Sequence, residues 1–295
     1  MKNLLLTLIL VTPYLQSDYL SHPKADILIN ELVNEHGFEE KYVKDVLAGA
    51  EKKQKIIDSI SKPAEFTWTW DRYKKLFIEE KRIKNGKIFI NQNIKVLEQA
   101  EKEFGVPKEV ITAIIGVETR YGKIQGGYRV IDSLLTLGFD YPRRSKFFRK
   151  ELVNFFLLTR ENELDILDIK GSYAGAMGYG QFISSSYRAY AIDYDGDGNA
   201  DLFNSVEDAI GSVANYLYIH GWKREGEIVY ESFPNNVRKV FKPSKGLSKF
   251  IPLSFNESGR DINFIGDDNF IAITKYNISH FYAMAVYYLS EELKT

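Results

Sequence analysis

Apolar residues recur with the 3.6-residue period of a helix along most of the chain. Residues 24–60 show this pattern twice, and Gly37 separates the two expected helices. Gln181 and Phe182 are expected to begin a helix that runs to about Ala191. The same period predicts further helices over 70–77, 97–104, 132–137, 147–158, 206–218 and 279–293. The fold is therefore expected to be predominantly α.

From about Gly226 the pattern changes to short segments rich in β-branched and aromatic residues. Gly, Asn, Asp and Pro separate these segments, as expected for strands joined by turns. The segments cover 227–233, 249–255, 260–266 and 269–277. They predict a small antiparallel β subdomain, so the expected fold class is α+β with a helical majority.

One expected helix covers residues 106–122, with the sequence VPKEVITAIIGVETRYG. Three isoleucines and Glu118 fall at positions i, i+3, i+4 and i+7, so they share one face. Pro107 is typical of the first position of a helix, and Gly122 is well placed to end it. Almost every other position is apolar, so we expect this helix to be buried.

Glu118 is the candidate catalytic residue of this helix. A charged, unpaired carboxylate on an apolar face costs free energy. Burial and the negative end of the helix dipole are both expected to raise its pKa. A carboxyl group that stays protonated near neutral pH can act as a general acid. The simpler alternative is a partly exposed glutamate that pairs with Arg120 or Lys123.

Two loops and one aromatic face are further candidates for ligand binding. Residues 171–182 (GSYAGAMGYGQF) are rich in glycine, which lets a ligand approach the backbone, although a flexible turn has the same composition. Trp70 and Tyr73 share a helical face that core packing explains. Aromatic faces also bind sugars, so Tyr73 is a candidate. Arg143 and Arg144 follow a proline in a loop, where a solvated surface is the alternative to a function.

An acidic loop at residues 193–204, DYDGDGNADLFN, matches the first half of an EF-hand loop. Asp193, Asp195 and Asp197 occupy positions 1, 3 and 5, and Gly198 is the glycine required at position 6. Carboxylates at this spacing repel one another unless a cation lies among them. An acidic turn without a metal is the alternative.

The second half of the same loop departs from the EF-hand pattern. Asn199 would offer its backbone carbonyl at position 7. Position 12 is Asn204, so the usual bidentate glutamate is missing. Glu207 or Asp208, at the start of the next expected helix, could replace it.

The composition is that of an ordinary globular protein, with 295 residues, 44% of them hydrophobic and 27% charged. Lys and Arg number 39, Asp and Glu 40, and the formal net charge is −1. No overall basic field is therefore available to attract nucleic acid or an anionic membrane. The absence of cysteine excludes disulfides, thiol catalysis, zinc–thiolate sites and a lipoprotein lipid anchor.

The first 16 residues resemble a secretory signal peptide. Lys2 precedes an apolar run from Leu4 to Val11, and this run is too short for a comfortable membrane span. A buried N-terminal helix is the alternative. An exported chain without cysteine fits the bacterial periplasm, which is the expected location.

Several sequence blocks together resemble the lytic murein transglycosylases of the MltB type, a family of the lysozyme-like glycosidase superfamily. In chain order the blocks are GVETRYG (116–122), LGFDYPRR (137–144), GSYAGAMGYGQF (171–182), SSSYRAY (184–190), DYDGDG (193–198), AIGSVANY (209–216), HGW (220–222) and residues 276–285. Their order and spacing hold over about residues 65–290.

The resemblance implies a lysozyme-like catalytic core, an extra helical domain, an EF-hand-like metal loop and a small antiparallel β subdomain. The implied divisions are a signal peptide (1–16), an N-terminal helical region (17–100), a catalytic core (101–225) containing the metal loop (193–204), a β subdomain (226–278) and a C-terminal helix returning to the core (279–295).

The activity implied by the resemblance is cleavage of the β-1,4 bond between N-acetylmuramic acid and N-acetylglucosamine in cell-wall peptidoglycan. The product would carry a 1,6-anhydromuramoyl end, so the enzyme would be a carbon–oxygen lyase. The expected partners are peptidoglycan glycan strands, and the protein is expected to be a monomer.

The resemblance also assigns residues one by one. Glu118 matches the catalytic acid/base of the family. The residues that match the family's sugar-binding positions are Tyr73, Gln181, Phe182, Tyr216, Asn277 and Tyr282. The residues that match its metal ligands are Asp193, Asp195, Asp197 and Asn199, with Asp208 or Glu207 completing the site. The expected ion is a structural Ca²⁺, with Na⁺ as the alternative.

Two other functions remain open at this point. Ordinary glycoside hydrolases use two carboxylates, and Asp132 or Asp140 could place the water of a lysozyme-type hydrolase. A calcium-stabilised peptidoglycan-binding protein without catalysis is the second alternative, although it would not need a protonated acid at position 118. If Glu118 acts alone, the substrate's own C6 hydroxyl has to attack C1.

Overall fold

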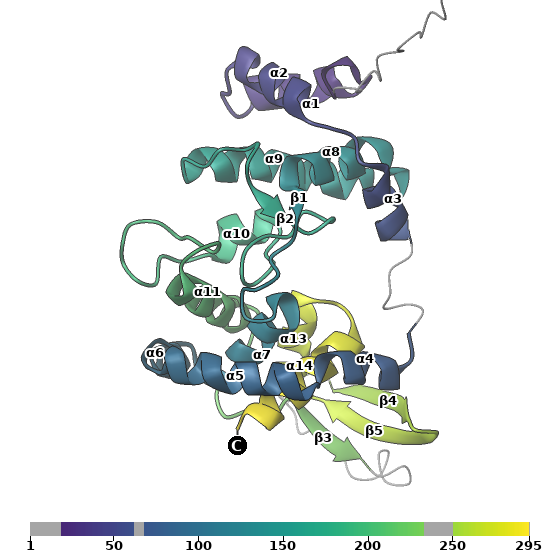
Figure 1. Ribbon diagram of the computed structural model, residues 1–295, viewed down its shortest axis with the longest axis vertical. Helices are drawn as coiled ribbons and strands as arrows, with labels where there is room; N and C mark the ends of the chain where they lie inside the picture. Colours follow the sequence, from purple (N-terminus) through teal and green to yellow (C-terminus); the bar gives the residue numbers. More distant parts are fainter. Residues whose placement is uncertain (1–18, 62–67, 233–249, 295) are drawn as a thin grey trace, which may run out of the picture.

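The computed structural model describes residues 19–61, 68–232 and 250–294. The expected signal peptide over 1–16 lies outside the described residues. The helices are stacked along the longest axis of the molecule, with α1 and α2 at one end and the three-stranded sheet at the other (Figure 1). No helix in the described ranges is long and apolar enough to cross a membrane.

The N-terminal helices pack onto two long helices of the core. Among these elements, α3 contacts α8, and Tyr19 of the first 3₁₀ helix donates a hydrogen bond to Asp140 at the end of α8 (3.0 Å). Their bounds are η1 Tyr19–Ser21, α1 Ala25–Asn34, α2 Glu40–Gly49, α3 Gln54–Ser61, α8 Val130–Asp140, η3 Pro142–Arg144 and α9 Ser145–Glu161.

The prediction of two helices over 24–60 is wrong, because the segment forms three. The backbone of Ala50 is extended, which ends α2. The amide of Glu51 then donates a hydrogen bond to the buried carboxylate of Asp132 (2.8 Å), and the chain turns into α3. A tertiary hydrogen bond thus sets the break between α2 and α3.

A second group of helices surrounds α7, which carries Glu118. Helices α5, α6, α11 and α14 all contact α7. Helix α5 was not predicted, and α6 begins three residues before the predicted start at Leu97. The bounds are α4 Trp70–Phe77, α5 Glu80–Gln92, α6 Ile94–Phe104, α7 Lys108–Thr119, α11 Val206–Ile219 and α14 His280–Leu293.

A glycine-rich loop crosses the middle of the molecule between β1 (Tyr128–Arg129), β2 (Lys170–Gly171) and α10 (Ser184–Tyr190). The two short strands pair antiparallel. The prediction that Gln181 and Phe182 begin a helix is wrong. Gln181 has a positive φ of 51°, and Phe182 exchanges backbone hydrogen bonds with Met177 (2.9 Å each way), so both precede α10.

The β subdomain is an antiparallel sheet with strand order β3-β5-β4. Its strands are β3 Val229–Ser232, β4 Ile251–Glu257 and β5 Arg260–Gly266. The strand predicted over 269–277 is wrong, since α13 spans Asp268–Tyr276. The Asp267 side chain accepts a hydrogen bond from the Asp268 amide and caps this helix, and Phe270 and Ile273 bury one face of it.

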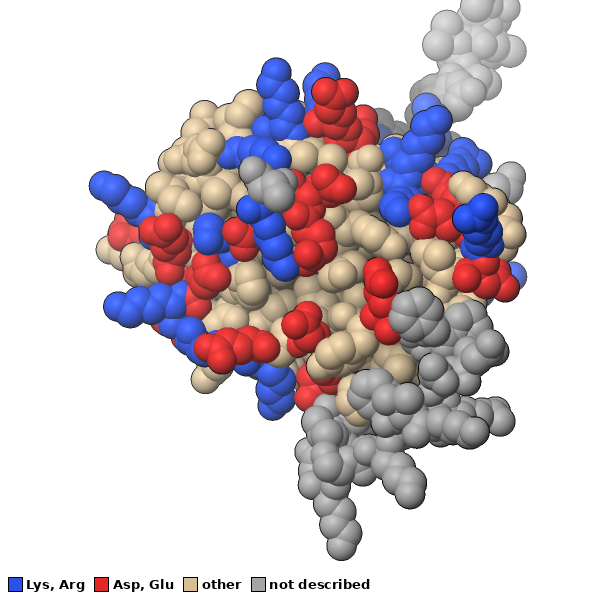
Figure 2. Space-filling model, turned by 90° about the horizontal axis from the view of Figure 1, so that it is seen from below, with Lys and Arg blue, Asp and Glu red and all other residues tan. Residues whose placement is uncertain are grey.

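Charges of both signs are interspersed on the face that Figure 2 shows. This agrees with the formal net charge of −1. On this face no single sign of charge dominates, so the shape and chemistry of individual sites carry the functional argument.

Candidate active site

Glu118 lies in the last turn of α7. Residues 110–117 of this helix are buried, as predicted, whereas Glu118 itself is only partly buried. The prediction that the helix ends at Gly122 is wrong: it ends at Thr119, and Arg120 and Tyr121 adopt left-handed backbone conformations (φ 53° and 63°). The carboxylate therefore projects from the point where a buried helix opens towards solvent.

The turn after Glu118 is fixed by Thr119 and Gly122. The Thr119 hydroxyl lies 2.9 Å from the Tyr179 carbonyl, to which it donates, and it accepts the Gly122 amide at 2.9 Å. Gly122 has a φ of 81°, and a Cβ there would lie 1.9 Å from the Tyr179 ring. Both the positive φ and the close approach of the Tyr179 ring therefore require glycine at this position.

A buried arginine supports the same turn from α5. Arg82 is 4% exposed, and its guanidinium donates to the Gly116 carbonyl at 2.5 Å. The Tyr121 hydroxyl donates to the Arg82 carbonyl at 2.9 Å. Arg120, which the simpler alternative paired with Glu118, forms an ion pair with Glu79 (3.1 Å).

Four aromatic residues from separate parts of the chain form what we call the aromatic wall: Phe182, Tyr216, Tyr276 and Tyr282. Ring centroids are 5.7 Å apart for Phe182 and Tyr216 and 4.8 Å apart for Tyr216 and Tyr276. Tyr276 and Tyr282 are parallel, with an interplanar angle of 8° at 6.4 Å. The structure thus brings three of the predicted sugar-binding residues together and adds Tyr276.

The aromatic wall reaches Glu118 through its last two tyrosines. Burial raises the pKa of Tyr282 and of Tyr276 well above the ordinary value, and the Glu118 carboxylate raises both further. The Tyr282 hydroxyl is buried, and its interaction with the Glu118 carboxylate contributes to the rise of its pKa. Both phenols therefore stay protonated at neutral pH beside the candidate acid.

Tyr276 is a site residue that the sequence reasoning missed. Its hydroxyl donates to the Gly180 carbonyl at 2.6 Å, and a Cβ at Gly180 would lie 2.7 Å from that hydroxyl. The available signal was its position next to the predicted Asn277. Tyr276 thus joins the end of α13 to the glycine-rich loop.

Gln181 holds the glycine-rich loop through its side-chain amide. The Nε2 atom donates to the carbonyls of Gln125 (2.9 Å) and Gly178 (3.0 Å). Gln181 itself is partly exposed next to the buried Phe182. This predicted sugar-binding residue therefore also has a structural role in the loop.

Asn277 and Tyr73 occupy different environments. Asn277 is partly exposed at the end of α13, where its Oδ1 accepts the Ser279 amide (3.0 Å). Tyr73 is 3% exposed, with its ring 4.7 Å from Phe77 and 5.6 Å from Phe281. Packing in the core therefore accounts for most of the contacts of the Tyr73 ring. An electrostatic interaction with Tyr73 also raises the pKa of Tyr282. Contact of Tyr73 with sugar stays a prediction.

The acidic loop gathers the three predicted aspartates. Carboxylate oxygens of Asp193, Asp195 and Asp197 all lie within 4.8 Å of one another. Asp193 is held in place by the amides of Gly196 (2.8 Å) and Gly198 (2.8 Å). The side chains are exposed, and oxygen donors in this arrangement suit a hard cation such as Ca²⁺.

Asp208 fastens this loop to α11. It is fully buried and accepts the amides of Tyr194 (2.7 Å) and Asp195 (3.2 Å) on one oxygen and of Asp201 (2.7 Å) on the other. Burial raises its pKa, opposed by these hydrogen bonds. Asp208 therefore shapes the loop, and its direct ligation of a metal, like that of Glu207 and Asn199, stays a prediction.

The two carboxylates considered for a hydrolase are engaged with the N-terminal helices. Asp132 is 1% exposed and pairs with Arg129 (2.9 Å). Asp140 accepts from Lys52 (2.7 Å) and from Tyr19. These partners explain both residues without a role in catalysis.

Comparison with known proteins assigns the chain to a family. The family described as transglycosylase SLT domain matches residues 21–291. Membrane-bound lytic murein transglycosylase B of Escherichia coli (strain K12) is 38% identical over 302 residues, which cover 93% of this chain and 83% of that protein.

Two solved structures extend the comparison to the fold. The catenated lytic transglycosylase SltB1 of Pseudomonas aeruginosa has a TM-score of 0.87 and 41% identity, covering 94% of this chain and 99% of that one. The Escherichia coli lytic transglycosylase Slt35 in complex with calcium has a TM-score of 0.84 and 36% identity, covering 94% and 95%. The family resemblance noted in the sequence is thus confirmed, and the protein belongs to the transglycosylase SLT domain family.

Proposed function

We propose that this protein is a peptidoglycan lytic transglycosylase whose single acid/base is Glu118. The proposed bond is the β-1,4 linkage between N-acetylmuramic acid and N-acetylglucosamine. The observation that carries the proposal is the position of Glu118 at an open helix end beside two protonated tyrosines. The relatives named above are lytic transglycosylases, which supports the same class of enzyme.

In the proposed reaction Glu118 first protonates the leaving glycosidic oxygen. The muramoyl N-acetyl group stabilises the cationic centre at C1. The ionised Glu118 then accepts the proton of the C6 hydroxyl as that oxygen attacks C1, which closes a 1,6-anhydro ring. The sugar's own hydroxyl has a large effective concentration once the ring is held in place.

The aromatic wall would hold the sugar in that conformation. Tyr282 would donate a hydrogen bond near Glu118, because its raised pKa keeps it protonated, whereas Tyr276, whose proton is donated to the Gly180 carbonyl, would offer its ring and its phenol oxygen. Phe182 would add an apolar face, and Gln181 and Asn277 would contribute polar contacts. Tyr216 is held in the aromatic wall by its hydrogen bond to the Lys275 carbonyl (2.6 Å).

We also propose that the acidic loop binds one structural Ca²⁺. Asp193, Asp195 and Asp197 would supply carboxylate oxygens and Asn199 a backbone carbonyl, with Asp208 or Glu207 completing the set. The related Slt35 structure is described as a complex with calcium, which supports this choice of ion.

The expected cellular setting follows from the proposed substrate. Peptidoglycan lies outside the cytoplasmic membrane, so we place the protein in the periplasm. The N-terminal helical region (17–100) would form the extra domain, and the remaining divisions stay as expected from the sequence. In the structure, helix α3 of this region contacts α8, while α5 and α6 contact α7 and α4 contacts α14.

The substitution Glu118→Gln tests the catalytic assignment. It keeps the shape of the side chain and removes the transferable proton, so we expect turnover of purified sacculi to fall by about 10²–10⁴-fold. The matched control is Glu109→Gln in the first turn of the same helix, where the carboxylate pairs with Lys108 (3.4 Å). Activity of Glu118→Gln within about tenfold of the parent would remove Glu118 from the mechanism.

The digestion products distinguish a lyase from a hydrolase and from a binding protein. A lyase gives muropeptides lighter by one water, with no reducing muramic end and no label from ¹⁸O water. A labelled reducing end would establish a hydrolase. Binding to sacculi without any released product would establish a binding protein.

A further inference from the structure

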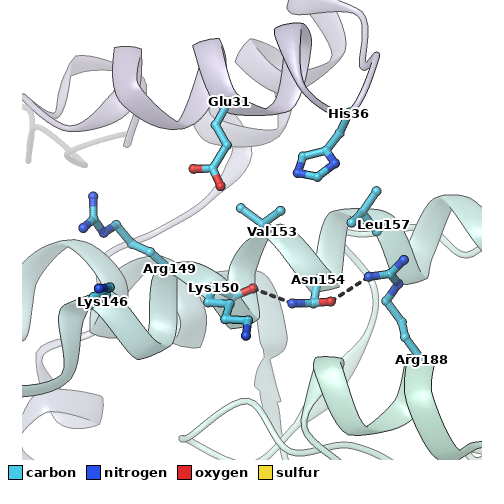
Figure 3. A pocket seen from close by; sticks show the side chains of 9 residues that line it. All are labelled: Glu31, His36, Lys146, Arg149, Lys150, Val153, Asn154, Leu157 and Arg188. Atoms are coloured by element: carbon cyan, nitrogen blue, oxygen red, sulfur yellow. Dashed lines mark hydrogen bonds between the residues drawn. The ribbon is translucent and has the colours of Figure 1, made fainter.

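A basic pocket lies between α1 and α9, away from Glu118. Its volume is about 430 Å³. Figure 3 shows Glu31 and His36 on the α1 side and the basic side chains on the α9 side. Figure 1 places α1 and α9 towards one end of the molecule and α7 and α14 towards the other. The pocket is therefore separate from the proposed catalytic centre.

Three basic side chains line the α9 side of this pocket. Lys146, Arg149 and Lys150 lie on the first turns of α9, and among the described residues none of them forms an ion pair. Lys146 is also close to the positive end of the α9 dipole, which favours anions. Binding of an anion would therefore be electrostatically favourable at these three positive charges.

Arg149 supplies the most specific feature. The aliphatic part of its side chain packs on Gly138, where an added Cβ atom would lie 3.2 Å from the Arg149 Cγ. Its Nε is buried and makes no hydrogen bond. A buried N–H without an acceptor costs free energy, and a small movement of the guanidinium towards a carboxylate or phosphate oxygen in the pocket would relieve this cost. By contrast Arg188 is already held by Glu161 (2.7 Å).

The rest of the pocket favours a peptide over a simple inorganic anion. Val153 and Leu157 form an apolar strip between the α1 side and the basic side of the pocket, and this strip suits small apolar side chains. Glu31 points into the pocket from the α1 side, and its carboxylate can accept hydrogen bonds from peptide N–H groups. Glu31, Glu35 and His36 are also close enough to hold a metal, but the three cations opposite would repel one.

We propose that this pocket binds a carboxylate-bearing peptide of the peptidoglycan substrate. This rests on the proposed function, because only such a substrate carries short peptides on its glycan strands. A free carboxylate would lie against Arg149, Lys146 and Lys150, while the peptide backbone faces Glu31. The pocket would then anchor the enzyme to one strand's peptide while Glu118 acts on a glycan.

Binding to two substrates tests the proposal. The inactive Glu118→Gln protein is mixed with purified sacculi, or with glycan strands whose peptides an amidase has removed. The variant Arg149→Gln/Lys150→Gln should bind sacculi roughly tenfold more weakly, as expected for lost charge-assisted hydrogen bonds, and bind stripped strands unchanged. The variant Lys146→Gln/Lys150→Gln, at exposed side chains, should show the same preference if the first variant folds poorly.

Two controls make the result specific. Lys84→Gln/Lys95→Gln on α5 and α6 removes the same charge at exposed positions and should not weaken binding. The peptide fraction released by the amidase should displace the protein from sacculi, whereas inorganic phosphate at equal concentration should not. Equal weakening on both substrates, equal weakening by the control variant, or equal displacement by phosphate would each overturn the proposal.

The readout is binding at low temperature, so it does not depend on which residue performs the chemistry. Retained cleavage by Glu118→Gln would contradict the proposed function and leave the pocket intact. Unchanged binding by both pocket variants would contradict the pocket and leave the proposed function intact.

Discussion

At the scale of single residues, Tyr276 connects the sugar-binding side of the site to its glycine-rich loop. The hydrogen bond from its hydroxyl to the Gly180 carbonyl (2.6 Å) crosses from the end of α13 to residues 178–182. The same ring stands between Tyr216 and Tyr282 in the aromatic wall. One side chain therefore orders both the loop and the stack of rings.

Replacing Tyr276 with Phe should reduce stability by about 1 kcal/mol, because the Gly180 carbonyl loses a partly buried donor while the ring remains. Urea unfolding measures this loss. The control is Tyr218→Phe on α11, a residue that is 56% exposed. Equal stability of the two variants would show that the hydrogen bond contributes nothing.

At the scale of elements, the acidic loop is coupled to the loop after Glu118 through backbone and side-chain hydrogen bonds. The Tyr187 hydroxyl donates to the Ala200 carbonyl (2.6 Å), and the Tyr179 amide donates to the Leu202 carbonyl (2.9 Å). Tyr179 in turn accepts the Thr119 hydroxyl, one residue after Glu118. A disordered acidic loop would therefore loosen the turn that presents the acid.

If the acidic loop binds calcium as proposed, removal of the ion should lower the melting temperature. A metal that binds only the folded state adds about 2.7 kcal/mol at one hundred times its dissociation constant. Chelator should shift the melting temperature of the parent and leave Asp195→Ala unaffected, because that variant lacks a carboxylate of the set. A chelator shift of the same size in both proteins would locate the metal elsewhere.

At the scale of the whole molecule, many tyrosines are buried between stacked helices. Burial raises the pKa of Tyr216 from 10.0 to about 12, and it also raises the pKa of Tyr121 and of Tyr187. Ionisation of these phenols is thus harder in the folded state than in the unfolded state. The buried tyrosines therefore contribute their full stabilisation below pH 10. This contribution is lost as the pH rises towards their pKa values in the folded state.

Stability should therefore fall as the pH rises from 10 to 12. The rise of the Tyr216 pKa from 10.0 to about 12 alone corresponds to about 3 kcal/mol, since one pKa unit is worth about 1.4 kcal/mol. Urea unfolding at a series of pH values, with phenolate absorbance followed in parallel, measures the effect. Tyr216→Phe should show a shallower decline, and a parallel decline would exclude this tyrosine as a source.

The sequence by itself determined the main functional helix and the acidic loop, because both rest on local spacing. Glu118 follows three isoleucines at helical intervals, and the aspartates at 193, 195 and 197 converge through their own loop backbone. Short-range periodicity also predicted α4, α11 and α14. Such features need no knowledge of distant neighbours.

Only the tertiary structure decided the features that depend on distant contacts. Segment 269–277 has β-branched residues, yet the Asp267 cap and the buried face of Phe270 make it a helix. Tyr276 acts through Gly180, nearly a hundred positions away in the chain, and the unpaired Nε of Arg149 is on a side chain that packs against Gly138 of α8. Long-range hydrogen bonds and burial are fixed by packing, so no local pattern can predict them.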